Sequence, residues 1–297
     1  THRPVTIGLA ALFVLPPLAG VGFESSTLLA AASIFALYAA INLVWMLIIG
    51  TAGVSSLATY SVVGAAAYGS AYCSIHFGMP WWALPFIGVP IGLVFGLIIA
   101  LPATRLDGFY YALLTLGLNE LCRTYVLQSK VFGSATGGLY GAQSYIPDSL
   151  SADGQLLLGY YASLVLLVMA LALYRTINGR RLGRILRMAP EQKEAFAEAC
   201  GIDYRRARIQ VFLLSSMALG FIGGFYAAHF RGASPSLFSI DTVALGLAML
   251  MIGGMQRAEG AVLGTFIVVG LHHGLVGLGP LRLILIGVLM LAVVLVL

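Results

Sequence analysis

Long runs of residues without any formal charge are the dominant pattern along this chain. Residues 25–104 contain no Asp, Glu, Lys or Arg, and residues 154–174, 209–230 and 260–281 form three further uncharged, mostly apolar runs. A membrane-spanning helix needs roughly 20 predominantly apolar residues, so the first run alone is long enough for about three crossings. The pattern therefore predicts a chain that crosses a membrane many times.

These runs predict nine or ten membrane-spanning α-helices. They are continuous and rich in Leu, Ala and Gly, whereas the strands of a transmembrane β-barrel alternate between apolar and polar positions. The 36 glycines suit close packing between such helices. The expected spans are Val5 to Phe23, Thr27 to Ile49, Leu57 to Ile75, Trp81 to Leu101, Phe109 to Gln128, Leu156 to Ile177, Ile209 to Phe230, Thr242 to Met255, Ala261 to Val276 and Leu281 to Leu297.

Composition leaves too few polar residues for a water-facing surface. Hydrophobic residues make up 60% of the chain and charged residues only 9%, against about 25% charged residues in ordinary soluble domains. We therefore expect an all-α, polytopic integral membrane protein in which residues 1–297 form a single transmembrane domain. The three cysteines are scattered and form no CxxC pair, so they predict neither a disulfide framework nor a metal knuckle.

The basic residues are concentrated in one segment between spans. Nine of the 16 Lys and Arg residues lie between Arg175 and Arg208, and the positive-inside rule places such a segment in the cytoplasm. Counting spans from it puts the stretch from Lys130 to Gln155 on the opposite side and the N-terminus, with Arg3, in the cytoplasm. We therefore expect a multi-pass protein of a bacterial-type inner membrane. The net charge of +5 follows from this topology and does not indicate a nucleic acid partner.

The third expected span is unusually polar at its start. Between residues 50 and 69, hydroxyl side chains and glycines interrupt an otherwise apolar stretch. One interpretation is a broken or re-entrant segment beside a translocation path, because irregular backbone at membrane depth is tolerated only against protein or a water-filled cavity. The other is a kinked packing helix whose Ser and Thr side chains bond to their own backbone. The candidates for lining a cavity are Ser55, Ser56, Thr59, Tyr60 and, from a later span, Thr115.

Few ionisable residues fall inside the expected spans. Asn119, Glu120 and Arg123 lie late in the span that begins at Phe109. Glu120 and Arg123 are three residues apart, so they share one helical face and can pair with each other. Charged groups within a membrane are costly and point to function by default. These residues are therefore either a structural pair or part of the lining of a polar path.

The basic segment contains a short stretch with the signals of a surface helix. Residues 189–201 read APEQKEAFAEACG, with Pro190 suited to the first helical position, Glu191 and Glu194 in the first turn, and Gly201 as the stop. Two kinds of position recur at helical spacing, the acidic Glu191, Glu194 and Glu198 and the apolar Ala195, Phe196, Ala199 and Cys200. The helix either docks on a partner or is a solvated loop helix.

Several pieces of the chain resemble one transporter family in the same order. Residues 181–227, RLGRILRMAPEQKEAFAEACGIDYRRARIQVFLLSSMALGFIGGFYA, resemble the coupling segment and following span of LivM-type permeases from branched-chain amino acid ABC importers. The further pieces are RLDGFYYALLTLGLNELCR at 105–123, ATGGLYG at 135–141 and SPSLFS at 234–239. Together these pieces extend over most of the chain.

The resemblance implies a subunit of a larger assembly. It implies a second homologous permease subunit, two ABC ATPase subunits and an extracytoplasmic substrate-binding protein, all associated with membrane lipid. The solute it implies is a branched-chain amino acid or a related amphipathic molecule such as an amide, urea or an organic acid. Within a coupling segment of about residues 178–208, the residues implied to dock on an ATPase are Pro190, Glu191, Glu194, Ala195, Glu198, Ala199 and Gly201.

The chain has no nucleotide-binding motif of its own. A P-loop needs GxxxxGK followed by Ser or Thr, but the only lysines, Lys130 and Lys193, are followed by Val and Glu. ATP and Mg would therefore act in the partner ATPase subunits, and we expect a transport subunit without catalytic residues or a cofactor. The histidines near span ends lack the carboxylates or third ligand that a metal site needs.

Two other functions are consistent with a membrane protein. A secondary transporter driven by an ion gradient would need a buried carboxylate in the membrane, and Glu120 is the sole candidate in the sequence. A membrane-embedded enzyme would need Asp, His or Glu clustered at a span end, and the sequence has no such cluster. The leading interpretation is the permease subunit of an ATP-driven importer.

Overall fold

The fold is known from a computed structural model that describes residues 25–103, 106, 108–132, 137–147, 149–188, 204–254, 257–275, 279 and 281–296. Within these residues the chain is almost entirely helical, and the only strands are the two-residue β1 (Leu139–Tyr140) and β2 (Gly232–Ala233). The α-helices are α2 (Ser25–Met46), α3 (Thr59–Phe77), α4 (Leu84–Ala103), α5 (Gly108–Gln128), α6 (Ala152–Gly179), α7 (Arg181–Met188), α9 (Tyr204–His229), α10 (Ile240–Gly253), α11 (Ala258–Gly274) and α12 (Leu281–Val296). The expected all-α fold is confirmed.

The helices follow the spans expected from hydropathy. Each expected span from Thr27 onward coincides with one of the helices, whereas the first, Val5 to Phe23, lies outside the described residues. Four stretches of the described chain are long and apolar enough to cross a membrane, namely Thr27–Thr51, Trp81–Ala103, Ala152–Gly179 and Arg206–His229. Helices α3 and α5 are of similar length but more polar, and α10 to α12 are shorter.

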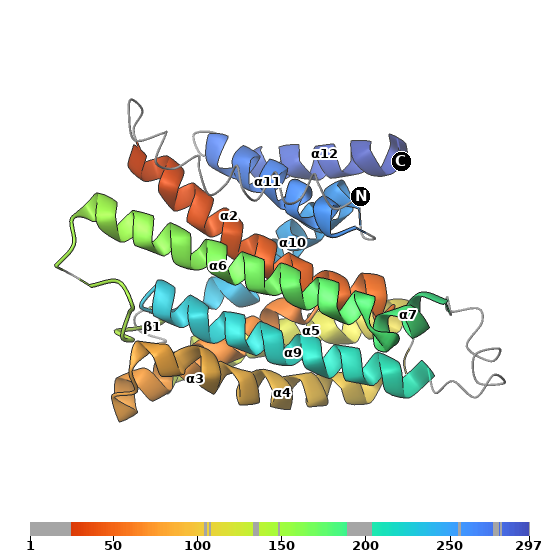
Figure 1. Ribbon diagram of the computed structural model, residues 1–297, viewed down its shortest axis with the longest axis horizontal. Helices are drawn as coiled ribbons and strands as arrows, with labels where there is room; N and C mark the ends of the chain where they lie inside the picture. The colour runs from red at the N-terminus through yellow and green to blue at the C-terminus, as the bar shows by residue number, and fades with distance from the viewer. Residues whose placement is uncertain are drawn as a thin grey trace.

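The helices form three groups that share one core. Helices α3, α4 and α9 pack together, α2 lies along α6, and α10 and α11 pack against each other and against α2 (Figure 1). Helix α2 is central, since 78% of its span is buried, whereas only 33% of the α4 span is buried. A central α2 explains how Asn42 is tolerated within it. The Asn42 amide nitrogen donates a 2.9 Å hydrogen bond to Thr265 Oγ1 on α11.

Small residues bring α4 and α9 into backbone contact. Gly88, Gly92 and Gly96 recur every four residues on α4, opposite Ser216 and Gly220 on α9. A Cβ on Gly88 would overlap the carbonyl oxygen of Gly220, and a Cβ on Gly92 would overlap that of Ser216. Lipid tails are as apolar as the helix surfaces, so helix association in a membrane depends on such close packing.

The two ends of the bundle differ in their loops. At one end, Leu139 pairs with Ala233 and Tyr140 with Gly232 in the antiparallel β1–β2 ladder. Helix α7 lies at the opposite end (Figure 1). The connections before α6 and after α9, which the expected topology places on the same side of the membrane, are therefore joined to each other, and this pairing is compatible with that topology.

Candidate translocation path

The connection between α2 and α3 is irregular, but over fewer residues than the sequence suggests. Helix α2 continues into a π-helical turn, η1 (Leu47–Thr51), and regular structure resumes at Thr59. Residues 52–58 between them form no regular helix, and Gly53 has a φ of 65°. The indole nitrogen of Trp45 donates a 2.8 Å hydrogen bond to the carbonyl oxygen of Ser56, which fixes the irregular backbone against α2.

Helix α5 provides a buried polar face toward this connection. The backbone N–H of Leu57 donates to Thr115 Oγ1 at 3.0 Å. One turn further along α5, Asn119 Oδ1 accepts a hydrogen bond from Ser61 Oγ, and Asn119 Nδ2 donates to the carbonyl oxygen of Phe238. Thr115 and Asn119 are completely buried. Of the third-span hydroxyls, that of Ser61 therefore bonds to α5, while those of Ser70 and Ser74 bond to the carbonyl oxygens of Leu84 and Met79.

The predicted path residues have different environments. Ser55 is exposed at the irregular connection, and Ser56 is buried beneath it. Thr59 and Tyr60 are buried, and their hydroxyls have no hydrogen-bond partner among the described residues. The Tyr60 ring packs edge-on against Trp45, with ring centroids 5.7 Å apart. In the described conformation Thr115, Asn119 and Tyr60 thus join helices together, while Ser55 and Glu120 remain accessible.

The side of α5 that carries Glu120 and Arg123 is only partly covered by the described chain. Glu120 and Arg123 form the predicted ion pair, with Arg123 Nη1 2.9 Å from Glu120 Oε1 and both side chains 40% exposed. Glu120 follows the start of α5 by 12 residues and precedes its end by eight, so it lies about 18 Å and 12 Å from the two ends. An upright α5 therefore places the pair within the hydrocarbon layer. Helix α5 also exposes several large apolar residues, namely Tyr110, Leu113, Leu114, Leu121 and Tyr125.

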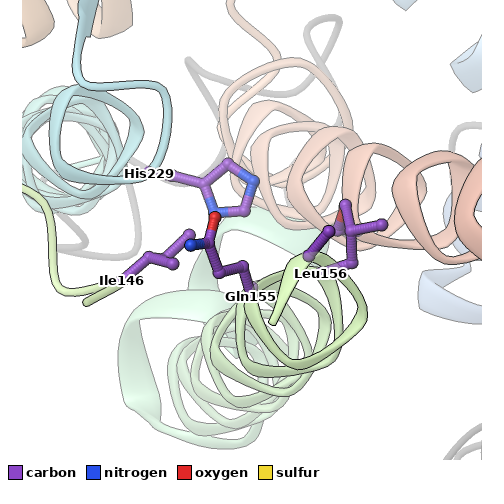
Figure 2. A pocket seen from close by; sticks show the side chains of 7 residues that line it. Ile146, Gln155, Leu156 and His229 are labelled. Carbon is purple, nitrogen blue, oxygen red and sulfur yellow. The ribbon is translucent and has the colours of Figure 1, made fainter. Parts of the chain in front are cut away.

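A cavity of about 380 Å³ opens near the β1–β2 end of the bundle. Figure 2 shows Gln155 and His229 lying together on one wall, with Ile146 and Leu156 on either side. His229 Nδ1 lies 2.6 Å from the hydroxyl of Tyr145. Burial raises the pKa of Tyr145, so this hydroxyl stays protonated, and the tautomer of the His229 ring decides which of the two groups donates. From the sequence, the histidines near span ends are considered only as metal ligands, and no local motif marks this cavity.

The residues implied to dock on an ATPase lie outside the described part of the chain. Pro190, Glu191, Glu194, Ala195, Glu198, Ala199 and Gly201 all fall within residues 189–203. Helix α7 ends just before this stretch and α9 begins just after it. The docking assignment therefore stays a prediction. Among the residues that the structure describes, no group of three or more His, Cys, Asp or Glu could hold a metal ion.

Comparison with known proteins identifies the family. Residues 27–294 match the family model for the permease component of branched-chain amino acid transport systems. The chain is 23% identical over 261 residues to the high-affinity branched-chain amino acid transport permease LivM of Escherichia coli, covering 80% of this chain and 61% of that protein. The LivM protein of Salmonella typhimurium is also 23% identical, over 256 residues that cover 78% of this chain and 60% of the relative.

A third relative comes from another organism. A probable LivM permease of Methanocaldococcus jannaschii is 28% identical over 184 residues, which cover 59% of this chain and half of that relative. This chain therefore spans about three fifths of the length of the two bacterial relatives. No solved structure matches it.

Proposed function

Because this chain belongs to the family of permease components of branched-chain amino acid transport systems, we propose that it is the membrane-spanning permease subunit of an ATP-driven importer. Its proposed solute is a branched-chain amino acid or a related small amphipathic molecule, such as an amide, urea or an organic acid, delivered by a binding protein. The chain itself supplies the path and performs no bond-making chemistry. A secondary transporter driven by an ion gradient is not favoured by this family membership.

The family match carries the importer proposal, and the accessible ion pair on α5 supports a location for the translocation path. Insertion of a charged side chain at the centre of a membrane helix costs roughly 3 kcal/mol on experimental insertion scales, so a lipid-facing position is unfavourable for Glu120 and Arg123. A protein neighbour or a water-filled path removes that cost. We therefore assign this face of α5 to the interface with a second homologous permease subunit, where the translocation path would run.

The buried face of α5 would set the position of this path. Thr115 and Asn119 hold α5 against the 52–58 connection, α3 and the 235–238 turn through direct hydrogen bonds. A helix held in this way has a fixed rotation about its axis, so the side that carries Glu120 and Arg123 points in a fixed direction. Ser55, Ser56, Thr59 and Tyr60 then lie beside the path or support it. Ser55 is already exposed, whereas Ser56, Thr59 and Tyr60 become accessible only if these helices move.

Two ABC ATPase subunits would dock at the α7 end of the bundle. The proposed docking helix, Pro190 to Gly201, lies in the sequence between α7 and α9, so its position is set by that end. Among the described residues near this end, Arg175, Arg181, Arg184, Arg206 and Arg208 lie in α6, α7 and α9, and Arg180 lies between α6 and α7. The clustering of these arginines supports a cytoplasmic location for the α7 end of the bundle. The binding protein would then dock at the β1–β2 end, across a bacterial-type inner membrane, and the N-terminus would be cytoplasmic.

Affinity purification of the chain from its native membrane tests the proposal. We expect two P-loop ATPases and a homologous permease to be identified by mass spectrometry. We also expect ATP hydrolysis by the complex in liposomes to be stimulated by the binding protein and to drive solute uptake. A chain that purifies alone and takes up solute under an ion gradient would overturn the proposal. For a complex that shows ATP-driven uptake, assays with leucine, urea and short amides would identify the solute class.

A further inference from the structure

The π-helical turn and the irregular residues after it are held by side chains from other helices. Beyond the bonds within the π-helical turn itself, backbone bonds in residues 47–58 run from Ala52 N–H to Leu47 O, from Val54 N–H to Ile48 O and from Ser56 N–H to Val54 O. These bonds do not form a continuous helical ladder. A segment of this kind has little stiffness of its own, so its position depends on the groups that hold it.

The first of these groups is Asn178 near the end of α6. Thr51 Oγ1 donates a 3.0 Å hydrogen bond to Asn178 Oδ1, and both side chains are more than nine-tenths buried. Asn178 is followed by Gly179, where α6 ends, and then by α7. The π-helical turn is therefore attached to the residue at which the chain leaves α6 for the coupling segment.

The second group is Arg208 at the start of α9. Its Nη2 donates a 3.0 Å hydrogen bond to the carbonyl oxygen of Gly53. Its Nε is buried and has no partner among the described residues. The neighbouring arginines Arg175, Arg180 and Arg184 are instead exposed, as expected of residues that only set topology. Arg208 thus attaches the irregular backbone to the residue at which the chain returns from the coupling segment.

The far side of the same segment is attached to α5. Leu57 N–H donates to Thr115 Oγ1, whose own hydroxyl donates to the α5 backbone at Tyr111 or Ala112. Four residues separate the Arg208 contact at Gly53 from the Thr115 contact at Leu57. A displacement of α6 or α9 at the α7 end would therefore act on this segment at Thr51 and Gly53, and the segment contacts α5 at Leu57.

We propose that residues 47–58 transmit movement of the coupling segment to the path-facing helix α5. Asn178 and Arg208, which lie at the two flanks of the coupling segment, are the positioning residues that hold residues 47–58 in place. The proposal rests on the importer function for its biological meaning. The physical link from Arg208 through residues 53–57 to Thr115 is a property of the chain itself and can be measured without transport.

Hydrogen exchange of the full chain in lipid nanodiscs measures the link. We expect Arg208→Gln and Thr51→Val each to accelerate exchange of the 52–58 amides by about tenfold, because each removes a buried hydrogen bond. The acceleration should extend to the α5 amides around Thr115 and be absent from α12. Arg175→Gln, which removes an exposed charge from the same end of the bundle, is the matched control and should change neither region. An acceleration confined to residues 52–58 would overturn the proposal.

A second measurement separates transmission from simple stabilisation. In the assembled complex, we expect Arg208→Gln to keep at least about half of the ATP hydrolysis, while solute uptake per ATP hydrolysed falls by about tenfold. Arg208→Lys should recover part of this loss, because Lys can still donate a hydrogen bond to the carbonyl oxygen of Gly53. An unchanged ratio of uptake to ATP hydrolysis, with less complex assembled, would show that Arg208 is only structural. If the wild-type complex shows no ATP-driven uptake, the proposed function fails, and the exchange measurement still decides the link.

Discussion

Gly88 of α4 and Gly220 of α9 meet backbone to backbone, so that a Cβ on either residue would overlap the carbonyl oxygen of the other. This relationship is possible only for glycine, because every other side chain would force the two helices apart. Gly224 repeats the contact one turn along α9, against the backbone of Leu84. The wall formed by α3, α4 and α9 therefore depends on residues that contribute no side chain at all.

The α4–α9 contact predicts a strong effect of added volume. Gly220→Leu should lower the free energy of unfolding by about 3 kcal/mol, since overpacking forces backbone displacement in a well-packed interface. Thermal unfolding of the chain in mild detergent measures the loss. Gly270→Leu, at a helical glycine of α11 where a Cβ would meet nothing within 4 Å, is the control and should change stability little. Equal unfolding temperatures for the two variants would contradict the backbone contact.

Asn119 should be essential for stability even though it lies beside the proposed path. Asn119→Leu leaves the Ser61 hydroxyl and the Phe238 carbonyl oxygen without their partner. A buried polar group without a partner costs about 1–3 kcal/mol, and we expect a loss near the upper end. Thr176→Val provides the comparison, because Thr176 is exposed and bonds only to its own helix at Ala172. A variant of Asn119 that folds normally but transports poorly would instead assign it to the path.

The Glu120–Arg123 pair should be required for transport rather than for folding. Glu120→Gln and Arg123→Gln are each expected to leave the unfolding temperature nearly unchanged, because the proposed water-filled path solvates the charge that remains, and ion pairs in contact with water contribute little to stability. Each should reduce uptake by the reconstituted complex by about tenfold through an unpaired charge in the path. The exchanged pair Glu120→Arg with Arg123→Glu should recover part of the activity. Wild-type uptake in both single variants would remove this face from the path.

Charge reversal in the predicted docking helix should weaken assembly. Glu194→Lys combined with Glu198→Lys is expected to reduce the amount of ATPase recovered with the permease by about tenfold, because the acidic stripe would meet basic groups on the partner. Asp153→Lys, at the start of α6, is the matched control and should leave recovery unchanged. Thermal unfolding of the purified permease should be the same for all three proteins. Unchanged recovery of the ATPases with the Glu194 and Glu198 variant would contradict the docking assignment.

Hydropathy was sufficient to predict the order of the long helices in the described part of the chain. The expected third span began at Leu57 and the helix begins at Thr59, a difference of two residues. The expected pairing of Glu120 with Arg123 also followed from their spacing, since residues three apart on a helix are neighbours. Both predictions concern local structure, which the period of the helix and the thickness of the membrane determine directly.

The contacts of individual residues were not predictable in the same way. Asn119 and Glu120 are adjacent in the sequence, yet Asn119 is completely buried and Glu120 is accessible. Arg208 was counted with the topology-setting arginines, but it bonds to Gly53, 155 residues away. Asn42 and Thr265 were not singled out, although they join α2 to α11.

The contacts of individual residues were not predictable because the lipid bilayer, rather than water, surrounds the helices. A helix in a water-soluble protein shows its buried face through its apolar stripe, whereas a membrane helix is apolar toward both lipid and protein. The sequence alone therefore determined that this chain crosses a membrane as a bundle of helices and that its basic segment marks one end. Only the tertiary structure decided the rotation of each helix, and with it that residues 47–58 join both flanks of the coupling segment to α5.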